Sequence, residues 1–317
     1  MPELATFGET MVRLSPPAGE RLETASELEL RTAGAESNVA IAASRLGADA
    51  TWLSKVPDSP LGRRVLGDLR RHAVDPNVAV SDDGRQGTYY LEHGGDPRGT
   101  DVVYDRDGAA VTTTTVNDVD LEAVHEATLF YTSGITPALS DSLRDTVGAL
   151  LRECQSAGTS TAFDLNYRSK LWSPEQAREC FEELLPRVDV LVAAERDVET
   201  VLGREGDPER VVRELRDEFA LRTVVLTLGA DGAFALDDDG PSRQHAYDAE
   251  TIDPVGTGDA FVGAFLARRL DGDTTPEALR YAAATAALKR TMTGDLAVLT
   301  PAEVEAILDG DTPDISR

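Results

Sequence analysis

The residues best suited to chemistry lie in a glycine-rich turn at 253–259, which reads Asp-Pro-Val-Gly-Thr-Gly-Asp. The turn runs directly into residues 259–267, which are apolar around the whole helical circumference and therefore predict a buried helix. The start of a helix offers free backbone N–H groups and the positive end of the dipole, and glycines let an anion approach that backbone closely. Gly256, Thr257 and Gly258 therefore predict a phosphate site.

Asp259 is a carboxylate beside this predicted anion site. A bound phosphate would repel the carboxylate unless it has a task, and a task that fits is accepting a proton from a hydroxyl group that attacks a phosphoryl group. Aspartate is also a favoured N-cap residue of helices. On residue type alone, a general base and a helix cap are equally good interpretations of Asp259.

The elements that must position these residues follow a regular alternation. From about residue 121 onward, short β-rich runs alternate with amphipathic segments, which is typical of strand–helix–strand units on a parallel sheet. We expect strands at 4–8, 51–55, 128–131, 159–164, 188–192 and 223–227. We expect helices at 37–46, 61–72, 140–157, 175–185, 195–202, 208–219 and, in an alanine-rich run, 281–290.

Two segments, 10–33 and 85–115, do not follow the alternation, and the second carries β-formers separated by Gly and Asp. We interpret them as two excursions that build a small β-sheet lid. The fold class is then α/β, with a doubly wound, mostly parallel sheet in a main domain of residues 1–9, 34–84 and 116–317. Exposed edge strands of a lid are a pairing surface, so we expect a homo-oligomer formed through the lid. Residues 237–240, Asp-Asp-Asp-Gly, predict a hairpin turn rather than a metal site.

The charge of the chain is unusual, because 57 acidic and 31 basic residues give a formal net charge of −26. This charge disfavours nucleic acid as a partner. Lys55, Lys170 and Lys289 are the only lysines. An acidic, lysine-poor composition indicates adaptation to high salt, where the Debye length shrinks to about 3 Å at 1 M; an acidic protein from an ordinary GC-rich organism is the alternative. Without a long apolar run or a basic leader, we expect a cytoplasmic protein with no membrane contact.

The turn at 253–259 resembles the C-terminal signature of the ribokinase-like, or PfkB, family of carbohydrate kinases, whose usual form is Asp-Thr-x-Gly-Ala-Gly-Asp. Pro254 and Thr257 depart from that form. The resemblance implies an anion hole formed by the Gly-Thr-Gly backbone and a catalytic base at the final aspartate, which correspond here to Gly256, Thr257, Gly258 and Asp259.

Further motifs extend the resemblance over nearly the whole chain. Residues 34–40 are similar to the family's N-terminal motif, which implies that Gly34 and Asn38 face sugar hydroxyl groups. Residues 227–232 resemble the family's nucleotide-site turn between two strands. The resemblance thus implies ATP as a cofactor, bound by Thr227, Gly229, Gly232, Gly256 and Gly258.

Magnesium is the second implied cofactor, because phosphoryl transfer from ATP needs a cation to compensate the developing charge. The family commonly carries Asn-x-x-Glu after the strand predicted at 188–192, and here the corresponding residues are Ala194 and Asp197. Asp197 is therefore the candidate for holding hydrated Mg²⁺, without the usual asparagine beside it.

Arginines and tyrosines suggest the acceptor. Arg168 follows the C-terminal end of a predicted parallel strand, where open α/β sheets place their ligands. Tyr104 and Arg106 share one face of a predicted lid strand, and Tyr89 lies on its neighbour. Guanidinium groups bind carboxylates as planar forks, so this set suits a sugar acid. Surface ion pairing is the alternative role of each arginine.

These residues, with the run at 164–173, resemble those of 2-keto-3-deoxygluconate kinases. The resemblance implies transfer of the ATP γ-phosphate to the 6-hydroxyl of that sugar acid, with Arg106 and Arg168 holding its carboxylate. 2-Keto-3-deoxygalactonate, which differs at one hydroxyl, is an alternative substrate. A 1-phosphofructokinase-like or ribokinase-like enzyme and a catalytically idle sugar-acid or nucleotide sensor are also compatible with these residues. A dehydrogenase is disfavoured, because no Gly-x-Gly-x-x-Gly follows the first predicted strand.

Overall fold

A nine-stranded sheet forms the centre of the molecule in the computed structural model, which describes residues 2–94 and 97–310. The strand order is β13-β12-β11-β10-β9-β8-β1-β4-β5. The strands are β1 (Leu4–Phe7), β4 (Ala50–Pro57), β5 (Asp75–Ser81), β8 (Leu129–Ser133), β9 (Ser160–Asp164), β10 (Val190–Ala194), β11 (Thr223–Thr227), β12 (Ala233–Asp237) and β13 (Gly240–Gln244). Neighbours from β5 to β11 are parallel, and only the β11-β12-β13 edge is antiparallel. The predicted doubly wound, mostly parallel sheet is confirmed.

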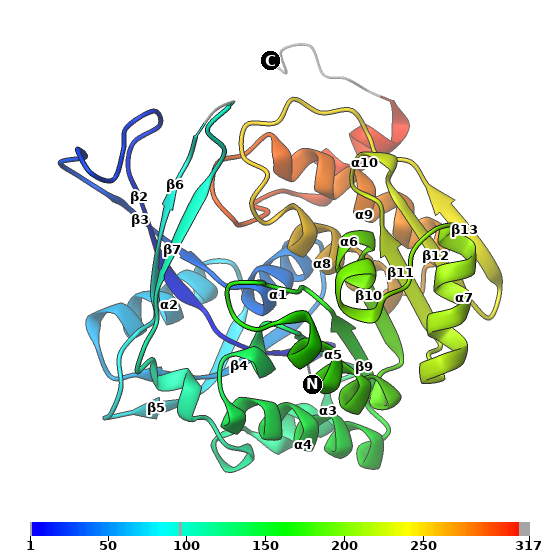
Figure 1. The fold of residues 1–317 in the computed structure, drawn as a ribbon, viewed down its shortest axis with the longest axis horizontal. Coiled ribbons are helices and arrows are strands. Elements are labelled where there is room, and N and C mark those ends of the chain that lie inside the picture. Colours follow the sequence, from blue (N-terminus) through cyan, green and yellow to red (C-terminus); the bar gives the residue numbers. More distant parts are fainter. Residues whose placement is uncertain (1, 95–96, 311–317) are drawn as a thin grey trace.

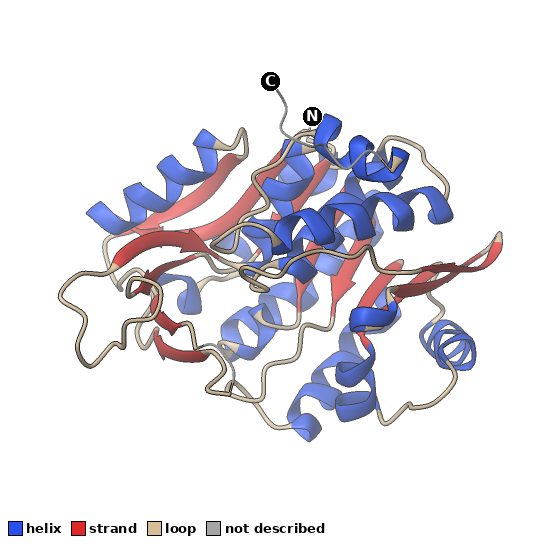
Figure 2. Cartoon of the chain, turned by 90° about the horizontal axis from the view of Figure 1, so that it is seen from above, coloured by secondary structure: helices blue, strands red, loops and turns tan. Residues whose placement is uncertain are grey.

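Helices cover both faces of this sheet (Figure 2). One buried apolar cluster joins the sheet to α1 (Ala35–Arg45), α2 (Pro60–Arg71), α8 (Thr257–Leu270), α9 (Thr275–Arg290) and α10 (Pro301–Asp309). A second cluster, on the other face, includes α3 (Leu121–Glu126), α4 (Asp141–Ala157), α5 (Pro174–Leu184) and α7 (Pro208–Phe219). Short 3₁₀ turns occupy Ala110–Thr113, Val116–Asp118, Thr136–Ala138, Leu185–Arg187 and Gly229–Asp231.

Most of the expected elements agree with the structure, but two helices differ in extent, and strand β5 and helices α3 and α10 were not expected. The helix expected at 195–202 is a single α turn, α6 (Glu195–Asp197), that widens into a π-helical turn at Val198–Leu202. The helix expected at 281–290 is only the C-terminal part of α9. Strand β5 was not expected, because Pro76 and polar residues obscure its pattern; it lies at the edge of the sheet, where proline is tolerated. The predicted hairpin turn is confirmed, since Asp237 pairs with Gly240 between β12 and β13.

A separate four-stranded sheet projects from the main body at the upper left of Figure 1. Its order is β3 (Glu29–Ala33), β2 (Met11–Ser15), β6 (Thr88–Glu92) and β7 (Asp101–Asp105), with β2 and β6 parallel and the outer pairs antiparallel. These strands lie in the segments predicted to leave the main sheet, and the second sheet itself is confirmed. We refer to these four strands as the lid sheet.

The two faces of the lid sheet differ in character. On one face, a small apolar cluster is buried toward the main domain, and its members are Met11, Ala33, Tyr89 and Leu91. On the other face, the strand registers place four residues in one row across the sheet: Leu30, Leu14, Tyr90 and Val103. The two ends of this row are on the edge strands and are 39% and 50% exposed. The outer face therefore carries an apolar stripe.

Close packing of α1 against α8 brings the starts of these two helices together. Gly263 in α8 makes this possible, because a Cβ atom there would lie 2.6 Å from Ala42 Cβ and 2.7 Å from the Val39 carbonyl oxygen of α1. The approach places Asn38, in the first turn of α1, beside Asp259, in the first turn of α8. The predicted catalytic residue thus lies where two helix starts meet the sheet.

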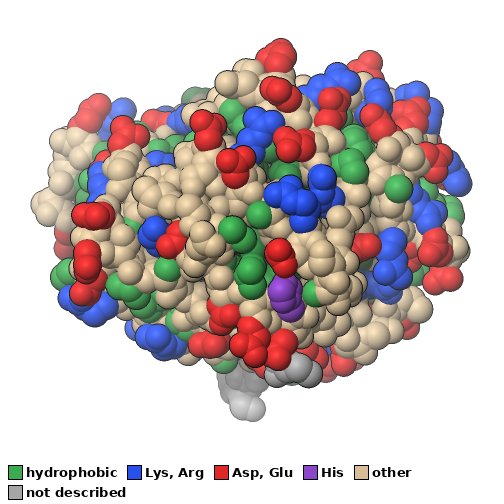
Figure 3. All heavy atoms as spheres, turned by 90° about the horizontal axis from the view of Figure 1, so that it is seen from below, with side chains coloured by type: hydrophobic (Ala, Val, Ile, Leu, Met, Phe, Trp, Pro, Cys, Tyr) green, Lys and Arg blue, Asp and Glu red, His purple; other side chains and the backbone are tan. Residues whose placement is uncertain are grey.

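Acidic and basic side chains lie side by side over the face drawn in Figure 3. Arginine carries most of the ion pairs, and many are exposed, such as Arg63 with Asp58 and Arg85 with Asp105. Such exposed pairs contribute little to stability individually. None of the helices in the described parts of the chain has the length and apolar character needed to cross a membrane.

Candidate active site

The glycine-rich turn before α8 has a backbone shape that only glycine fits at one position. Gly256 has a φ of 79°, and a Cβ atom there would collide with the Asp295 carbonyl oxygen. Asp253 shapes the same turn, since its Oδ1 accepts the Val255 N–H at 3.0 Å and its Oδ2 accepts the Gly294 N–H at 2.9 Å. The 253–258 segment, called the anion turn below, is therefore held against the loop at 293–295.

Asp259 is the third residue of α8 and does not cap it. The N-cap is Gly256, and no side chain caps the helix. The Asp259 carboxylate instead accepts a hydrogen bond of 2.7 Å from Asn38 Nδ2. The helix-cap interpretation of Asp259 is therefore wrong, because the carboxylate is turned toward α1.

The protonation of Asp259 is suited to accepting a proton. Burial raises its pKa from 3.8 to about 6, while the Asn38 hydrogen bond and the nearby Arg168 act in the opposite direction. At neutral pH the group is mostly ionised, yet its basicity is higher than that of an ordinary aspartate. A carboxylate tuned toward the working pH is a favourable general base.

A cavity of about 430 Å³ lies between the lid sheet and the anion turn, and we call it the acceptor cavity. It brings together all of the predicted acceptor-binding, catalytic and metal-binding residues: Gly34, Asn38, Tyr89, Tyr104, Arg106, Arg168, Asp197, Gly256, Thr257, Gly258 and Asp259. These residues come from the lid, α1, the loops after β9 and β10, and α8, so the fold gathers segments that lie far apart in sequence.

A second cavity of about 440 Å³ adjoins the first, and we call it the nucleotide cavity. It is lined by four of the predicted nucleotide-binding residues, Thr227, Gly229, Gly232 and Gly258, whereas the fifth, Gly256, lines only the acceptor cavity. Thr257 and Gly258 line both cavities. The anion turn therefore stands at the junction of the two spaces.

The wall of the nucleotide cavity is largely apolar and was only partly foreseen. Its apolar and aromatic members are Leu228, Ala246, Tyr247, Phe261, Ala283, Ala286 and Ala287. Small alanines on α9 leave a flat space that suits a planar heterocycle. The alanine-rich run in the sequence was the available signal, while the loop at 246–247 gave none.

Arg106 lies in the acceptor cavity with a carboxylate of its own. Its Nη1 is 3.1 Å from Glu9 Oε2, and its guanidinium carbon lies 4.3 Å from the centre of the Tyr104 ring. Burial raises the pKa of Glu9, and the neighbouring Arg106 opposes that rise. Glu9 was not predicted, although its place just after β1, at the carboxyl edge of the sheet, was a usable signal.

Among the residues that the structure describes, the positive charge of Arg168, unlike that of Arg106, is not balanced by a carboxylate in an ion pair. It donates to its neighbouring carbonyl, Tyr167 O, at 3.1 Å, and it has no carboxylate within ion-pair distance in the described structure. It lies near Asp164, whose pKa burial raises to about 8, with Asp259 and Asp197 adding to the rise and Arg168 opposing it. Asp164 is the last residue of β9, and Arg168 lies in the loop after it. The position of Arg168 at the carboxyl end of this strand agrees with the prediction.

The predicted metal-binding residue Asp197 is already engaged. Its Oδ2 accepts the Tyr167 N–H at 3.1 Å, and its Oδ1 lies 3.5 Å from Arg196 Nε. Within residues 2–94 and 97–310, no group of three or more His, Cys, Asp or Glu side chains is placed to hold a metal ion. The donor set therefore fits an ion that arrives with other oxygen ligands rather than one held by a ready-made protein cage.

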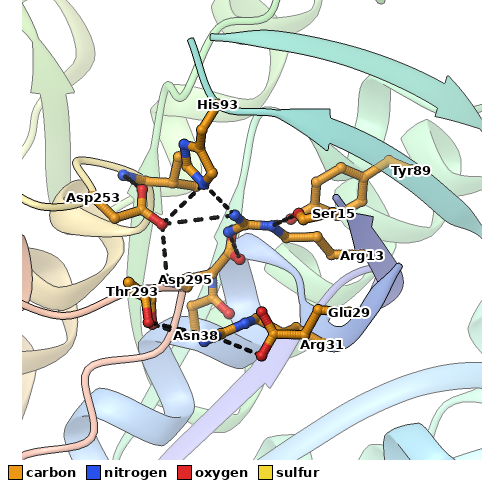
Figure 4. Close-up of polar contacts among 12 residues, drawn as sticks. Arg13, Ser15, Glu29, Arg31, Asn38, Tyr89, His93, Asp253, Thr293 and Asp295 are labelled. Carbon is orange, nitrogen blue, oxygen red and sulfur yellow. Dashed lines mark hydrogen bonds and ion pairs between the residues drawn. The ribbon is translucent and has the colours of Figure 1, made fainter. Parts of the chain in front are cut away.

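Tyr89 lines the acceptor cavity, but its hydroxyl group already has a partner. It donates to Asp295 Oδ1 at 3.0 Å, while Arg13 Nη1 donates to Asp295 Oδ2 at 2.6 Å (Figure 4). Neither Asp295 nor Arg13 was predicted. They are 282 residues apart and carry no motif, so only the folded chain reveals their contact.

Known proteins resemble this chain over almost its whole length. Residues 1–302 match the pfkB family carbohydrate kinase. A 2-dehydro-3-deoxygalactonokinase of Haloferax volcanii is 59% identical over 315 residues, which are 99% of each chain. The crystal structure of 2-dehydro-3-deoxygluconokinase from Thermotoga maritima has a TM-score of 0.90 at 33% identity, covering 97% of this chain and 98% of the other. A putative ribokinase II from E. coli in complex with ATP and Mg²⁺ shares the fold, with a TM-score of 0.89 at 23% identity over 98% of this chain and 100% of the other.

Proposed function

This chain belongs to the pfkB family of carbohydrate kinases, and we propose that it transfers the γ-phosphoryl group of ATP to the 6-hydroxyl group of a 2-keto-3-deoxy sugar acid. The observation that carries the proposal is the partly buried carboxylate of Asp259, which lines the acceptor cavity beside the junction of the two cavities, together with Arg106 and Arg168. We propose both 2-keto-3-deoxygluconate and its galactonate epimer as acceptors. The 59% identical relative supports the galactonate epimer, and the Thermotoga maritima structure supports the gluconate epimer.

The residues of the chain divide the work of this reaction. Asn38 orients the Asp259 carboxylate, which accepts the proton of the acceptor hydroxyl group as that oxygen attacks. The N–H groups of Gly258 and Asp259, in the first turn of α8, face the charge that develops on the transferred group. Arg168 binds the carboxylate of the acid, and Arg106 assists from the lid. An acceptor held at both ends places its terminal hydroxyl group beside Asp259.

Kinases of this family use ATP and a divalent metal ion, and we propose Mg²⁺ for this chain. The ion supplies charge neutralisation on the phosphate oxygens when it is bound. Asp164, Asp197 and Asp259 are the carboxylates that line the cavity at this point and offer hard oxygen ligands, directly or through water. The apolar wall of the nucleotide cavity suits the base of the nucleotide.

The decisive experiment measures ADP release in molar KCl with Mg²⁺ across a panel of acceptors. The panel contains both 2-keto-3-deoxy sugar acids, fructose 1- and 6-phosphates, ribose and adenosine. We expect the sugar acids to give the highest kcat/KM and the galactonate epimer to exceed the gluconate epimer. Phosphorylation of a neutral sugar in preference to both acids would overturn the proposed acceptor class, and absence of ADP release with every acceptor would support an idle sensor instead of a kinase.

We also propose that the chain forms a homodimer through the outer face of the lid sheet. The support is the apolar row across that face, which ends in the exposed Leu30 and Val103 on the two edge strands. Burying this row against a second copy would remove it from water. Light scattering after gel filtration should give twice the mass of the 317-residue chain, and Val103→Glu should give the monomer. A wild-type monomer at high concentration would refute the dimer.

A further inference from the structure

Arg13 is a buried arginine that the proposed reaction does not use. It lies on lid strand β2 and is only 2% exposed. Its Nη1 donates to Asp295 Oδ2 at 2.6 Å, its Nη2 lies 3.6 Å from Asp253 Oδ2, and its Nε donates to Ser15 Oγ at 2.9 Å. Figure 4 shows the guanidinium group of Arg13 between the two carboxylates. One lid side chain thus reaches two acids of the main domain.

Both of these acids belong to the structure that forms the anion turn. Asp253 accepts backbone N–H groups from Val255 within the turn and from Gly294 in the facing loop. The backbone of Asp295 lies directly against Gly256, so closely that a Cβ atom at the glycine has no room. A displacement of either acid would therefore move the N–H groups that face the phosphoryl group.

Other contacts from the lid end on the same two acids. Tyr89 of β6 donates its hydroxyl to Asp295, and His93, just after β6, has its Nε2 2.6 Å from Arg13 Nη2 and 3.4 Å from Asp253 Oδ2. From the opposite side, the fully buried Lys289 of α9 donates to the Asp253 carbonyl oxygen at 3.2 Å. Two buried cations, Arg13 and Lys289, therefore balance the two acids.

Burying these charged groups costs free energy that attachment of the lid alone does not require. Removing charged groups from water costs several kcal/mol per ion, and apolar side chains of similar size would join two layers equally well. What a planar, multiply bonded guanidinium adds is a defined direction and register. The lid sheet lines the acceptor cavity with Tyr89 and Tyr104, and Arg106 follows directly after β7, so the register of the sheet relative to the anion turn sets where an acceptor lies.

We propose that Arg13 is a positioning residue that holds the lid sheet and the anion turn in one fixed relation, so that the acceptor hydroxyl group and the phosphoryl site are aligned. This inference rests on the proposed function, because it assumes a phosphoryl acceptor bound under the lid. Arg13 acts through Asp253 and Asp295 and does not itself line either cavity.

The test compares three variants with the wild type, using the acceptor on which the wild type is most active. Arg13→Met removes the charge, Arg13→Lys keeps it, and Arg13→Met with Asp295→Asn removes one charge of each sign. The double change restores charge balance, and the amide still accepts the Tyr89 hydroxyl group. Arg85→Met is the matched control, since it breaks an exposed ion pair with Asp105 at the end of lid strand β7, and neither residue lines the acceptor cavity.

We expect Arg13→Met to lower kcat by roughly 10²-fold, the cost of a misplacement of about 1 Å at a reacting group, with KM for ATP nearly unchanged. Arg13→Lys should recover most of kcat. The double variant should regain the wild-type melting temperature but keep the low kcat, because its charges balance while the directional link is gone. The control should match the wild type in both readouts.

A purely structural role gives the opposite pattern. If the double variant recovers kcat together with its melting temperature, or if Arg13→Met is folded and retains wild-type kcat, the positioning role is overturned. Failure of the proposed acceptor is a separate result, because it is seen in the wild type on the acceptor panel before any variant is made.

Discussion

Replacing Asp259 with asparagine separates chemistry from structure at the centre of the site. The change keeps the size of the side chain, and the amide oxygen still accepts the 2.7 Å hydrogen bond from Asn38 Nδ2. What it removes is the negative charge and the ability to accept a proton. Because a positioned general base contributes about 10²- to 10⁴-fold, we expect kcat to fall by roughly 10²-fold or more.

The stability of the same variant should rise, and the pKa of Asp259 gives the magnitude. Folding raises this pKa from 3.8 to about 6, so the folded chain binds the proton more tightly than the unfolded chain. The associated stability is fully present below pH 3.8 and is lost as the pH increases through about 6. Above that pH, ionising the partly buried carboxylate costs about 3 kcal/mol, at about 1.4 kcal/mol per unit of pKa. The neutral amide avoids this cost.

The assay is ADP release together with thermal unfolding in molar KCl, measured below and above about pH 6. In the wild type, kcat/KM should fall below about pH 6 as Asp259 becomes protonated, and the residual activity of Asp259→Asn should lack this step. Asp271→Asn, at the exposed far end of α8, is the matched control and should leave kcat unchanged. A kcat of Asp259→Asn within tenfold of the wild type, or a clearly lower melting temperature, would refute the reasoning.

Three further predictions concern the rest of the site and the surface. Arg168→Ala should raise KM for the acid at least tenfold and leave KM for ATP unchanged; equal effects on both KM values would indicate general damage. Arg106→Ala should also lower the melting temperature, because it leaves buried Glu9 without its cation. Gly256→Ala should destabilise the chain by about 1–3 kcal/mol through its φ of 79°, while Gly258→Ala, which has open space around it, should not; equal melting temperatures would contradict this. Dilution from molar KCl to about 10 mM should lower the melting temperature, because the Debye length grows from about 3 to 30 Å and the chain has a net charge of −26. A salt-independent melting temperature would argue against a halophilic protein.

Local signals were enough to predict most of the sheet and its helices. Strand β11 and helix α7 occupy the predicted ranges to the residue, because each has a clear period bounded by turn or cap residues. Pro208 and the Asp207 cap, for example, mark the start of α7. The π-helical turn at Val198–Leu202 was not predictable in this way, since its apolar spacing is also compatible with an ordinary helix.

Part of the site was predictable, because glycine-rich turns and helix starts have recognisable local sequence patterns. Gly256 and Asp259 stand in a recognisable turn, whereas the bond between Asn38 and Asp259 depends on two helices packing across 221 residues. Glu9 and Asp295 line the acceptor cavity without any motif. Glu9 lies just after β1, at the edge where the parallel strands end, whereas Asp295 lies in the loop between α9 and α10 and is placed only by the folded chain. Long-range contact, rather than residue type, is what the sequence alone does not disclose.

The two cavities share five lining residues, two of them in the anion turn, yet the lid sheet contributes to only one cavity, which makes the site modular. The lid sheet and α1 line only the acceptor cavity, whereas α9 lines only the nucleotide cavity. Replacing the β6–β7 hairpin with one that carries different side chains should therefore change the acceptor while the phosphate donor stays the same. Such a replacement hairpin must keep a hydroxyl group at the position of Tyr89, so that the hydrogen bond to Asp295 is retained.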